Sequence, residues 1–429
     1  MFERLALIFK DKDLRKKILF VLGILVVFRI GAALPIPGIN VAELERLFQG
    51  NQLFGLLNIF SGGALDNLSI VMLGVGPYIT ASIIMQLLTM IIPRLKEIYS
   101  EEGEMGRKKF NQYSRLLTVP LAILQGFALL VLLERQGIIE NLTMAARLVN
   151  IVIITGGSVF LMWLGELISE KGIGNGISLL IFAGIVSSIP SALQQQFFKI
   201  SQQGFPFIDP SKIPVILAFL VAGIAVIAAV VIVTEGERPI PVSYAKRIRG
   251  MRVYGGVSTH LPLRVNQAGV IPIIFALSIL LFPQMFAGIL SKSGSSIAQS
   301  VAGALLWFLN STWLYGIFYF VLVFLFTYFY TAVTFDPDQI STNLQKQGAF
   351  VPGIRPGHPT SDFLARILNR ITLVGALFLG LIAVLPFVAQ GLTGDVGLTI
   401  GGTSLLIAVS VVLETVKQVD AQLVMREYD

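Results

Sequence analysis

Ten long apolar runs, separated by more polar segments, set the hydropathy pattern of this chain. Each run has about 20 residues, the length that an α-helix needs to cross the hydrocarbon core of a bilayer. The pattern therefore predicts an all-α polytopic membrane protein with ten transmembrane helices. The predicted spans cover approximately residues 18–38, 75–92, 115–133, 149–168, 177–195, 213–233, 268–289, 313–334, 371–388 and 399–416.

One of these runs is interrupted. Residues 61–93 read SGGALDNLSIVMLGVGPYITASIIMQLLTMIIP, and glycine, aspartate, asparagine and serine are scattered through the first half. Gly74, Gly76 and Pro77 separate the halves, and a proline inside a helix removes a hydrogen bond and clashes with the preceding turn. In lipid, irregular backbone survives only where protein or a water-filled cavity satisfies its polar groups. We therefore expect a half-helix that enters a cavity, followed by a spanning helix, as in a pore or transporter.

Composition supports the membrane assignment. Hydrophobic residues make up 55% of the chain, charged residues 13%, and the mean hydropathy is +0.79. A soluble domain carries about 25% charged residues. The absence of cysteine excludes disulfides and thiolate metal sites. The basic N-terminus leads into an apolar run too long for a signal-peptide core, so we expect a retained first span.

The distribution of Lys and Arg predicts the orientation of the spans. With ten spans both termini lie on one side, and 25 of the 32 Lys and Arg residues lie in the segments of that side. Positive residues favour the cytoplasmic side. Both termini are therefore predicted to be cytoplasmic, and the net charge of +7 mainly reflects topology and a partner-docking surface, so it need not indicate nucleic-acid binding.

Two predicted cytoplasmic loops, residues 234–266 and 334–370, are long enough to imply a function. In the first, β-prone residues at 242–244 and 253–254 flank a basic tip and predict a hairpin. The second is rich in turn residues around Arg355. Five spans before and five after the middle of the chain also suggest an inverted repeat.

The sequence contains no catalytic constellation. His260 and His358 both lie in predicted loops without a partner at metal-ligand spacing. The glycine-rich stretch 172–176 lacks the strand and helix of a nucleotide fold and is better explained as a tight loop before the fifth span. The spans themselves offer mainly Arg29 and Glu166 as charged groups, both near span ends where snorkelling explains them. We therefore expect neither an enzyme nor a cofactor, and an ion-coupled carrier is disfavoured, although unwound backbone can still bind sodium.

Several long stretches together resemble the SecY family, the pore subunit of the bacterial protein-translocation channel (the SecYEG translocon). The similarity covers nearly the whole chain and keeps the family's order of motifs. The matching stretches are FRIGAALPIPGIN (28–40), FSGGALDNLSI (60–70), GPYITASIIMQLL (76–88), EGEMGRKKFNQYSR (102–115), MWLGELISEKGIGNGISLLIFAGIV (162–186), YAKRIRGMRVYGGVSTHLPLRVNQAGVIPIIFA (244–276), FYTAVTFDPDQISTNLQKQGAFVPGIRPG (329–357) and GGTSLLI (401–407).

The resemblance implies ten helices in two inverted halves that open like a clamshell. The N-terminal half would be residues 1–195 and the C-terminal half residues 213–416, with a cytoplasmic tail at 417–429. Between them would lie an hourglass pore with a constriction. The matching motifs place this pore ring at Val75, Ile79, Ile177, Ile181, Ile274 and Ile407.

A plug is implied by the same resemblance. It would be a short re-entrant helix under the ring, within residues 61–72, and the alternative is an ordinary outer loop with a helical turn. Its residues would be Ser61, Gly62, Gly63, Ala64, Leu65, Asp66, Asn67, Leu68, Ser69 and Ile70.

The resemblance also implies a lateral gate between spans 2 and 7, backed by spans 3 and 8. Thr80, Gln86, Asn266 and Gln267 are candidate polar groups of this gate, although each alone is equally consistent with ordinary helix packing.

Finally, the two long loops resemble the docking sites for the motor ATPase SecA and the ribosome. The alternative role of their charges is to enforce topology. The candidate docking residues are Tyr244, Lys246, Arg247, Arg249, Arg252 and Arg355, and Met251 stands where the family pattern has a further arginine.

The function implied is a channel in the bacterial plasma membrane that passes unfolded preproteins, recognises signal peptides and releases transmembrane segments into lipid. SecA or the ribosome would drive it, and SecE-like and SecG-like small subunits would surround it. The rival hypothesis is a secondary solute transporter with broken helices.

Overall fold

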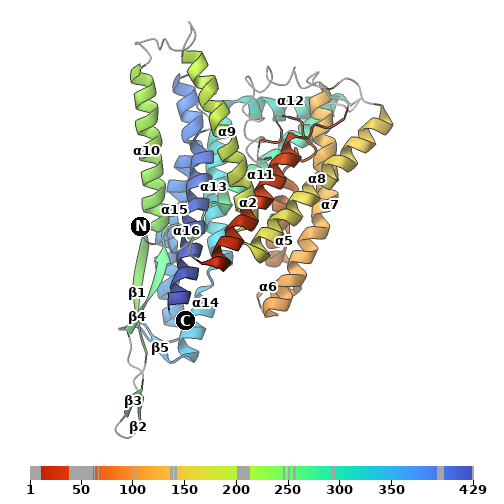
Figure 1. Cartoon of the computed structure of the whole chain (residues 1–429). Helices are drawn as coiled ribbons and strands as arrows, with labels where there is room; N and C mark the ends of the chain where they lie inside the picture. Colours follow the sequence, from red (N-terminus) through yellow and green to blue (C-terminus); the bar gives the residue numbers. More distant parts are fainter. Residues whose placement is uncertain are drawn as a thin grey trace.

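The chain forms an elongated bundle of long helices with a narrow β extension at one end (Figure 1). The structure is a computed structural model. It describes residues 11–37, 61, 63–65, 67–100, 102–135, 139, 143–200, 213–244, 247–249, 252–254, 258–290, 295–393 and 401–427.

Each predicted span coincides with one long helix of the described residues. These helices are α2 (Lys12–Ala33), α5 (Gly76–Ile91), α7 (Gly103–Arg135), α8 (Met144–Lys171), α9 (Gly176–Ile200), α10 (Ile213–Glu235), α11 (Ile271–Leu290), α13 (Thr312–Thr334), α15 (His358–Thr393) and α16 (Gly401–Glu427).

Length and apolar composition confirm that several of these helices are suited to a membrane. Among the described residues, four helices satisfy both criteria alone. α5 satisfies them together with α6 (Pro93–Ser100), from which it is separated by a bend of 116°. Four shorter apolar helices accompany them. Large apolar side chains such as Val26, Trp163 and Ile224 are exposed on the outside of the bundle, where lipid would surround them.

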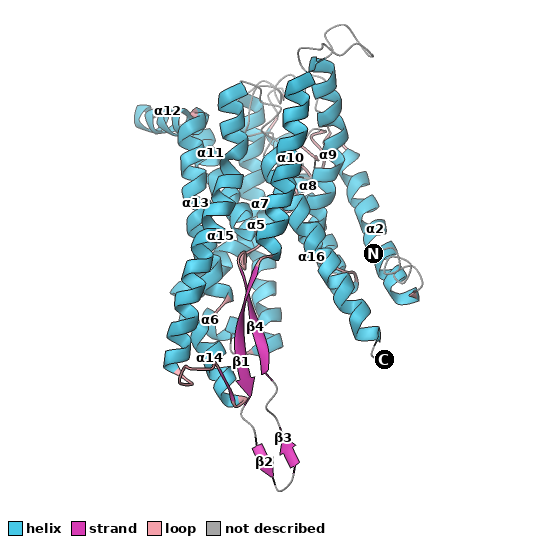
Figure 2. Ribbon diagram, turned by 90° about the vertical axis from the view of Figure 1, so that its left-hand side faces the viewer, coloured by secondary structure: helices cyan, strands magenta, loops and turns pink. Residues whose placement is uncertain are grey.

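Two further helices lie outside the predicted spans. α12 (Ser296–Asn310) lies across the end of the bundle opposite the β extension (Figures 1 and 2). α14 (Pro337–Lys346) belongs to the second long loop. Its N-cap Asp336 accepts hydrogen bonds from the backbone N–H groups of Asp338 and Gln339, and Pro337 occupies the first turn, where no N–H partner is needed.

The first long loop contains antiparallel β pairing, as a hairpin requires, but the two predicted strand segments, 242–244 and 253–254, do not pair with each other. β1 (Glu237–Tyr244) pairs antiparallel with β4 (Ser258–Arg264), and the short β5 (Ala349–Phe350) of the second long loop joins the other edge of β1. β2 (Arg247–Arg249) and β3 (Arg252–Tyr254) then form a separate ladder at the tip, far from the bundle (Figure 2).

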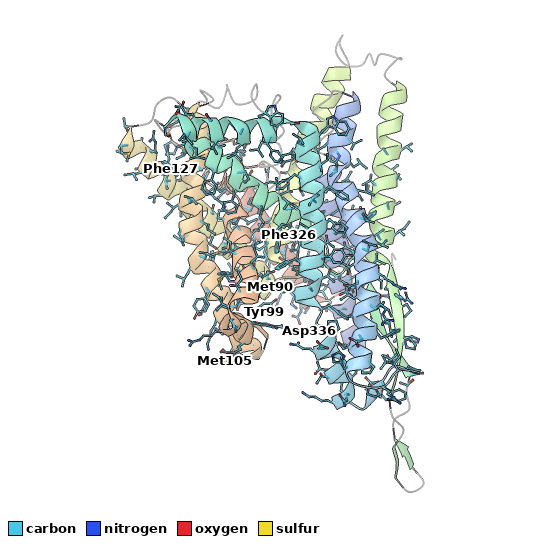
Figure 3. All side chains as sticks on the ribbon, turned by 180° about the vertical axis from the view of Figure 1, so that it is seen from behind. Met90, Tyr99, Met105, Phe127, Phe326 and Asp336 are labelled. Atoms are coloured by element: carbon cyan, nitrogen blue, oxygen red, sulfur yellow. The ribbon has the colours of Figure 1, made fainter. Side chains whose placement is uncertain are left out.

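The largest hydrophobic cluster draws residues from both halves of the chain. Helices α2, α5, α8 and α9 contribute to it, and so do α11, α13, α15 and α16. Figure 3 shows side chains filling the space between these helices, with Phe326 of α13 well inside the bundle and Tyr99 and Asp336 toward the end that carries the long loops. This cluster is where the candidate ring residues meet.

Candidate pore and lateral seam

The six candidate ring residues lie in one cluster, although they come from four helices. Val75, Ile79, Ile181, Ile274 and Ile407 are buried members of the main hydrophobic cluster, and Ile177 packs against it. Val75 and Ile79 are one turn apart at the start of α5, and Ile177 and Ile181 are one turn apart at the start of α9. The fold therefore brings these distant apolar side chains to a common centre.

Local sequence explains where α9 and its ring residues begin. Asn175 Oδ1 accepts hydrogen bonds from the backbone N–H groups of Ile177 (3.1 Å) and Ser178 (3.3 Å). This side chain caps the helix. The stretch 172–176 is thus the tight connection between α8 and α9, as the sequence indicated.

The predicted break before α5 is present, but the expected half-helix is not. Residues 63–65 and 67–75, where described, form turns, and Ser61 alone in this stretch is helical. The reason is visible in the backbone, since Leu68 has φ +42° and Gly74 has φ +59°, values that a right-handed helix does not allow. Gly62 and Asp66 of the proposed plug lie outside the described residues.

These turns are nevertheless tightly packed. Ala64, Leu65, Leu68 and Ser69 are almost completely buried. Ala64 belongs to the main hydrophobic cluster, whereas Leu65 and Leu68 belong to a second cluster with α7 and α8. An exposed loop would not bury these residues, so the segment belongs to the packed interior.

The segment is also bonded to the chain that follows α2. Ile36 N–H donates to the Leu68 carbonyl and Ile70 N–H donates to the Leu34 carbonyl, both at 2.9 Å. Asn67 Nδ2 donates to the carbonyl of Ala32 at 3.4 Å. The turns therefore attach to one side of the central cluster by backbone hydrogen bonds as well as by apolar contact.

α8 approaches the same segment through a glycine. A Cβ atom on Gly157 would lie 2.1 Å from the carbonyl oxygen of Ile70 and 3.2 Å from Cα of Val71. A side chain at this position is sterically excluded while the segment keeps its place. The sequence signal that we did not use is the Gly156–Gly157 pair inside an otherwise apolar span.

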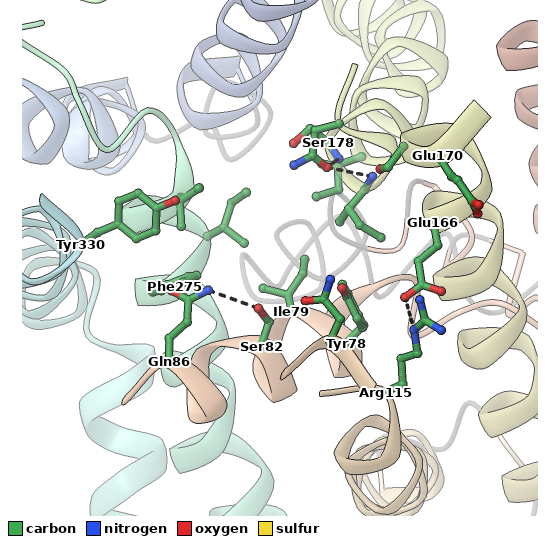
Figure 4. Close-up of a pocket in the computed structure, with 17 residues that line it drawn as sticks. Tyr78, Ile79, Ser82, Gln86, Arg115, Glu166, Glu170, Ser178, Phe275 and Tyr330 are labelled. Atoms are coloured by element: carbon green, nitrogen blue, oxygen red, sulfur yellow. Dashed lines mark hydrogen bonds and ion pairs between the residues drawn. The ribbon is translucent and has the colours of Figure 1, made fainter. Parts of the chain in front are cut away.

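A cavity of about 540 Å³ lies beside the cluster, and four ring residues, Ile79, Ile177, Ile181 and Ile274, form part of its wall (Figure 4). Ile271 and Phe275 add to the apolar surface, and the remaining lining side chains are polar. They include Ser82, Gln86, Asn111, Asn175 and Ser178. The cavity is therefore water-compatible, with an apolar patch formed by the ring residues.

The wall of this cavity contains an ion pair that the sequence did not predict. Arg115 Nε of α7 lies 2.5 Å from Glu166 Oε1 of α8 (Figure 4). We had explained Glu166 by snorkelling, whereas the structure gives it a partner 51 residues away. Arg29 likewise has a partner, because its Nη1 donates to Ser187 Oγ of α9 at 2.8 Å.

The helices of the proposed lateral seam are in contact with one another. α11 packs against both α5 and α7, and also against α13. Thr80 is directed to α7 rather than across the seam, since its Oγ1 accepts from Gln125 Nε2 at 3.4 Å and donates to the Gly76 carbonyl. Gln86 donates within its own helix to Ser82 Oγ. Thr80 is thus occupied on its own side of the seam, whereas the buried Gln86 Oε1 has no hydrogen-bond partner among the described residues.

On the opposite side of the seam, Asn266 and Gln267 lie in the turn that leads into α11. Asn266 is buried, and its Nδ2 donates to the Gly269 carbonyl at 3.2 Å. Gln267 is half-buried. The Oδ1 atom of Asn266 is buried and has no hydrogen-bond partner among the described residues, so this side chain makes no hydrogen bond across the seam.

The docking candidates lie in the β extension and the neighbouring turn. Tyr244 ends β1, Arg247 and Arg249 lie in β2, and Arg252 lies in β3, where it pairs with Arg249. Arg355 is exposed in the turn before α15. Lys246 lies outside the described residues.

Comparison with known proteins identifies the family of this chain. The family model for SecY matches residues 69–416. The chain belongs to the SecY family. The protein translocase subunit SecY of Mycobacterium bovis is 44% identical, with 97% of this chain and 96% of the relative covered. The same subunit of Streptomyces coelicolor is 44% identical over 100% of this chain and 99% of the relative. The chain is thus a multi-pass membrane protein of a family of channel subunits, not of enzymes, as expected from the sequence.

Solved structures share the fold. A structure described as a protein-conducting channel matches with a TM-score of 0.64 at 22% identity, covering 94% of this chain and 91% of the other. Sec61 in a canine ribosome–channel complex matches with a TM-score of 0.61 at 21% identity and the same coverage. The bundle is therefore the SecY/Sec61 channel fold.

Proposed function

We propose that this chain is the pore subunit of a protein translocase of the bacterial plasma membrane, with both termini in the cytoplasm. It passes unfolded secretory proteins across the membrane and releases transmembrane segments sideways into lipid. The observation that carries the proposal is the convergence of six apolar residues from four helices beside a polar cavity.

The pore ring of Val75, Ile79, Ile177, Ile181, Ile274 and Ile407 would act as a seal. A hydrophobic constriction excludes ions by dewetting when it is closed. Apolar side chains also make no directional bond to a passing peptide, so they deform around it without selecting its sequence. This chemistry suits a channel that has to accept many different chains.

The segment at 61–72 would be the plug. Most of its described residues are buried, and its backbone is hydrogen-bonded to the chain after α2, which supports a closed resting position. Opening would require this segment to leave the cluster. The break before Gly76 lets it move without moving α5.

Lateral release would take place between α5 and α11, with α7 and α13 behind them. The two inverted halves, residues 1–195 and 213–416, would separate along this seam. Signal peptides would enter it because their apolar core gains free energy by contact with lipid.

The β extension and the turn around Arg355 would dock the partners that supply energy. Basic side chains there fit ribosomal RNA phosphates and acidic surfaces of the motor SecA. Small subunits of the SecE and SecG kind would surround the bundle. No cofactor is required for a passive channel.

Reconstitution tests the proposal against the rival hypothesis of a solute transporter. Vesicles that contain the chain with SecE and SecG are expected to import a preprotein only when SecA and ATP are present. Uptake of a small solute without SecA, together with failure to import the preprotein, would overturn the proposal.

A further inference from the structure

The base of the β extension is connected to two helices that carry ring residues. We propose that Glu235, Gly236, Val265, Gly375 and Lys417 form a coupling collar, which transmits docking at the β extension to α11 and α16. Gly375 and Lys417 are its positioning residues. The inference rests on the proposed function, because it assumes that partners dock on the extension.

The β extension is stiff enough at its base to act as a lever. β1 and β4 pair continuously from Glu237↔Arg264 to Ser243↔Ser258. Ile240 of β1 and Leu263 of β4 are buried in a cluster with residues of α15 and its preceding turn. A displacement of the strands therefore reaches their base instead of being absorbed within the hairpin.

The first connection leads to α11. Val265 N–H donates to the Gly236 carbonyl at 2.8 Å, which extends the pairing of the strands to the end of α10. Val265 is followed by the buried Asn266, and α11 then begins at Ile271 with Ile274 in its first turn. A displacement of Val265 therefore also moves Ile274, the ring residue nine positions later.

α15 fixes the position of this connection. A Cβ atom on Gly375 would lie 2.6 Å from the carbonyl oxygen of Val265 and 3.9 Å from Cα of Asn266. The absence of a side chain at Gly375 lets the backbone before α11 rest directly on α15. Any larger residue there has to push Val265 away.

The second connection leads to α16. Lys417 Nζ lies 2.7 Å from Glu235 Oε1 at the last residue of α10, immediately before the β extension. α10 and α16 also pack along their lengths. Ile407 lies on the same helix as Lys417, ten residues before it, so this pair links the base of the extension to another ring residue.

A charge exchange tests the second connection. The chain, reconstituted with SecE and SecG, is assayed for the binding of SecA and for preprotein transport per bound SecA. Glu235→Lys or Lys417→Glu removes an attraction and adds a repulsion between like charges, so either variant is expected to reduce transport per bound SecA by about three- to thirtyfold. The double exchange restores it.

A glycine substitution tests the first connection. Gly375→Ala is expected to reduce transport per bound SecA by at least about threefold, because overpacking displaces Val265. Gly223→Ala on α10 is the control, since a Cβ atom there meets nothing within 4 Å. SecA binding and the yield of folded protein are expected to stay at the parental level in all variants.

Each outcome has a defined consequence. Parental transport in both single charge variants, or no recovery in the double exchange, would overturn the collar. Equal behaviour of Gly375→Ala and Gly223→Ala would do the same. Parent vesicles without SecA-dependent transport would instead overturn the proposed function.

Discussion

The close contact between α8 and the plug segment gives a sharp prediction for Gly157→Ala. The added Cβ would lie 2.1 Å from the Ile70 carbonyl oxygen, whereas ordinary contact begins at 3.4 Å. The backbone at Ile70 therefore has to retreat by about 1.3 Å if α8 stays in place. The neighbouring Gly156→Ala is the control, because its Cβ meets nothing within 4 Å.

The expected size of the effect follows from overpacking. Forcing an extra methyl into a packed site costs about 1–3 kcal/mol. If only the closed plug bears this cost, the equilibrium between displaced and closed plug shifts by about 5- to 150-fold. Both substitutions share the gain in helix propensity of about 1 kcal/mol, so the difference between them isolates the clash.

Planar-bilayer recordings measure this equilibrium as ion leak in the resting channel. Gly157→Ala is expected to open frequently without a substrate and to transport preproteins with defective signal sequences, while Gly156→Ala stays closed. Equal, tight recordings from both variants would refute the plug's position against α8.

Three further predictions concern the ring, an ion pair and the docking surface. Ile79→Asn should increase ion leak, because a polar side chain holds water in the constriction. Ile91→Asn, at an exposed position of the same helix, should not increase it, and equal recordings from the two variants would contradict the ring. Glu134→Ala breaks a largely buried ion pair and should destabilise the purified protein by about 3–5 kcal/mol, which lowers its melting temperature. Lys108→Ala, at an exposed ion pair, should leave the melting temperature unchanged. Arg355→Glu should weaken ribosome binding and reduce its salt dependence in sedimentation assays, and unchanged binding would remove this residue from the docking surface.

Hydropathy was sufficient to predict where the long helices of the described residues lie, because each contains an apolar run. Only four of these helices alone, or five with the bent pair α5 and α6, have the length and composition to cross a bilayer. The charged ends of α7 and α15 were not predicted as helix. They extend the bundle beyond the apolar runs, and their stability comes from neighbouring elements such as α6 and α14. The β-prone residues around a basic tip were sufficient to predict β pairing in this loop. They do not show which residue of one strand pairs with which residue of the other, because only the folded structure fixes this register.

The candidate site was less predictable than the fold. The expected plug helix was wrong for the described residues, because hydropathy gives no information about the positive φ of Leu68. The partner of Glu166 is distant in sequence, so only the tertiary fold reveals the ion pair. The contact of Gly157 with Ile70 is likewise a property of two packed backbones. The roles of the ring, gate and docking residues stay predictions.

The central claim is that a translocating chain passes through the pore ring. Because the sequence has no cysteine, a single cysteine can be introduced without a background, as Ile181→Cys in the ring or Leu325→Cys on the exposed face of α13. A preprotein with one cysteine, arrested during SecA-driven transport, is then oxidised to form a disulfide. The account predicts a crosslink to Ile181→Cys and none to Leu325→Cys, and a preprotein that crosslinks to neither, or only to Leu325→Cys, would contradict it.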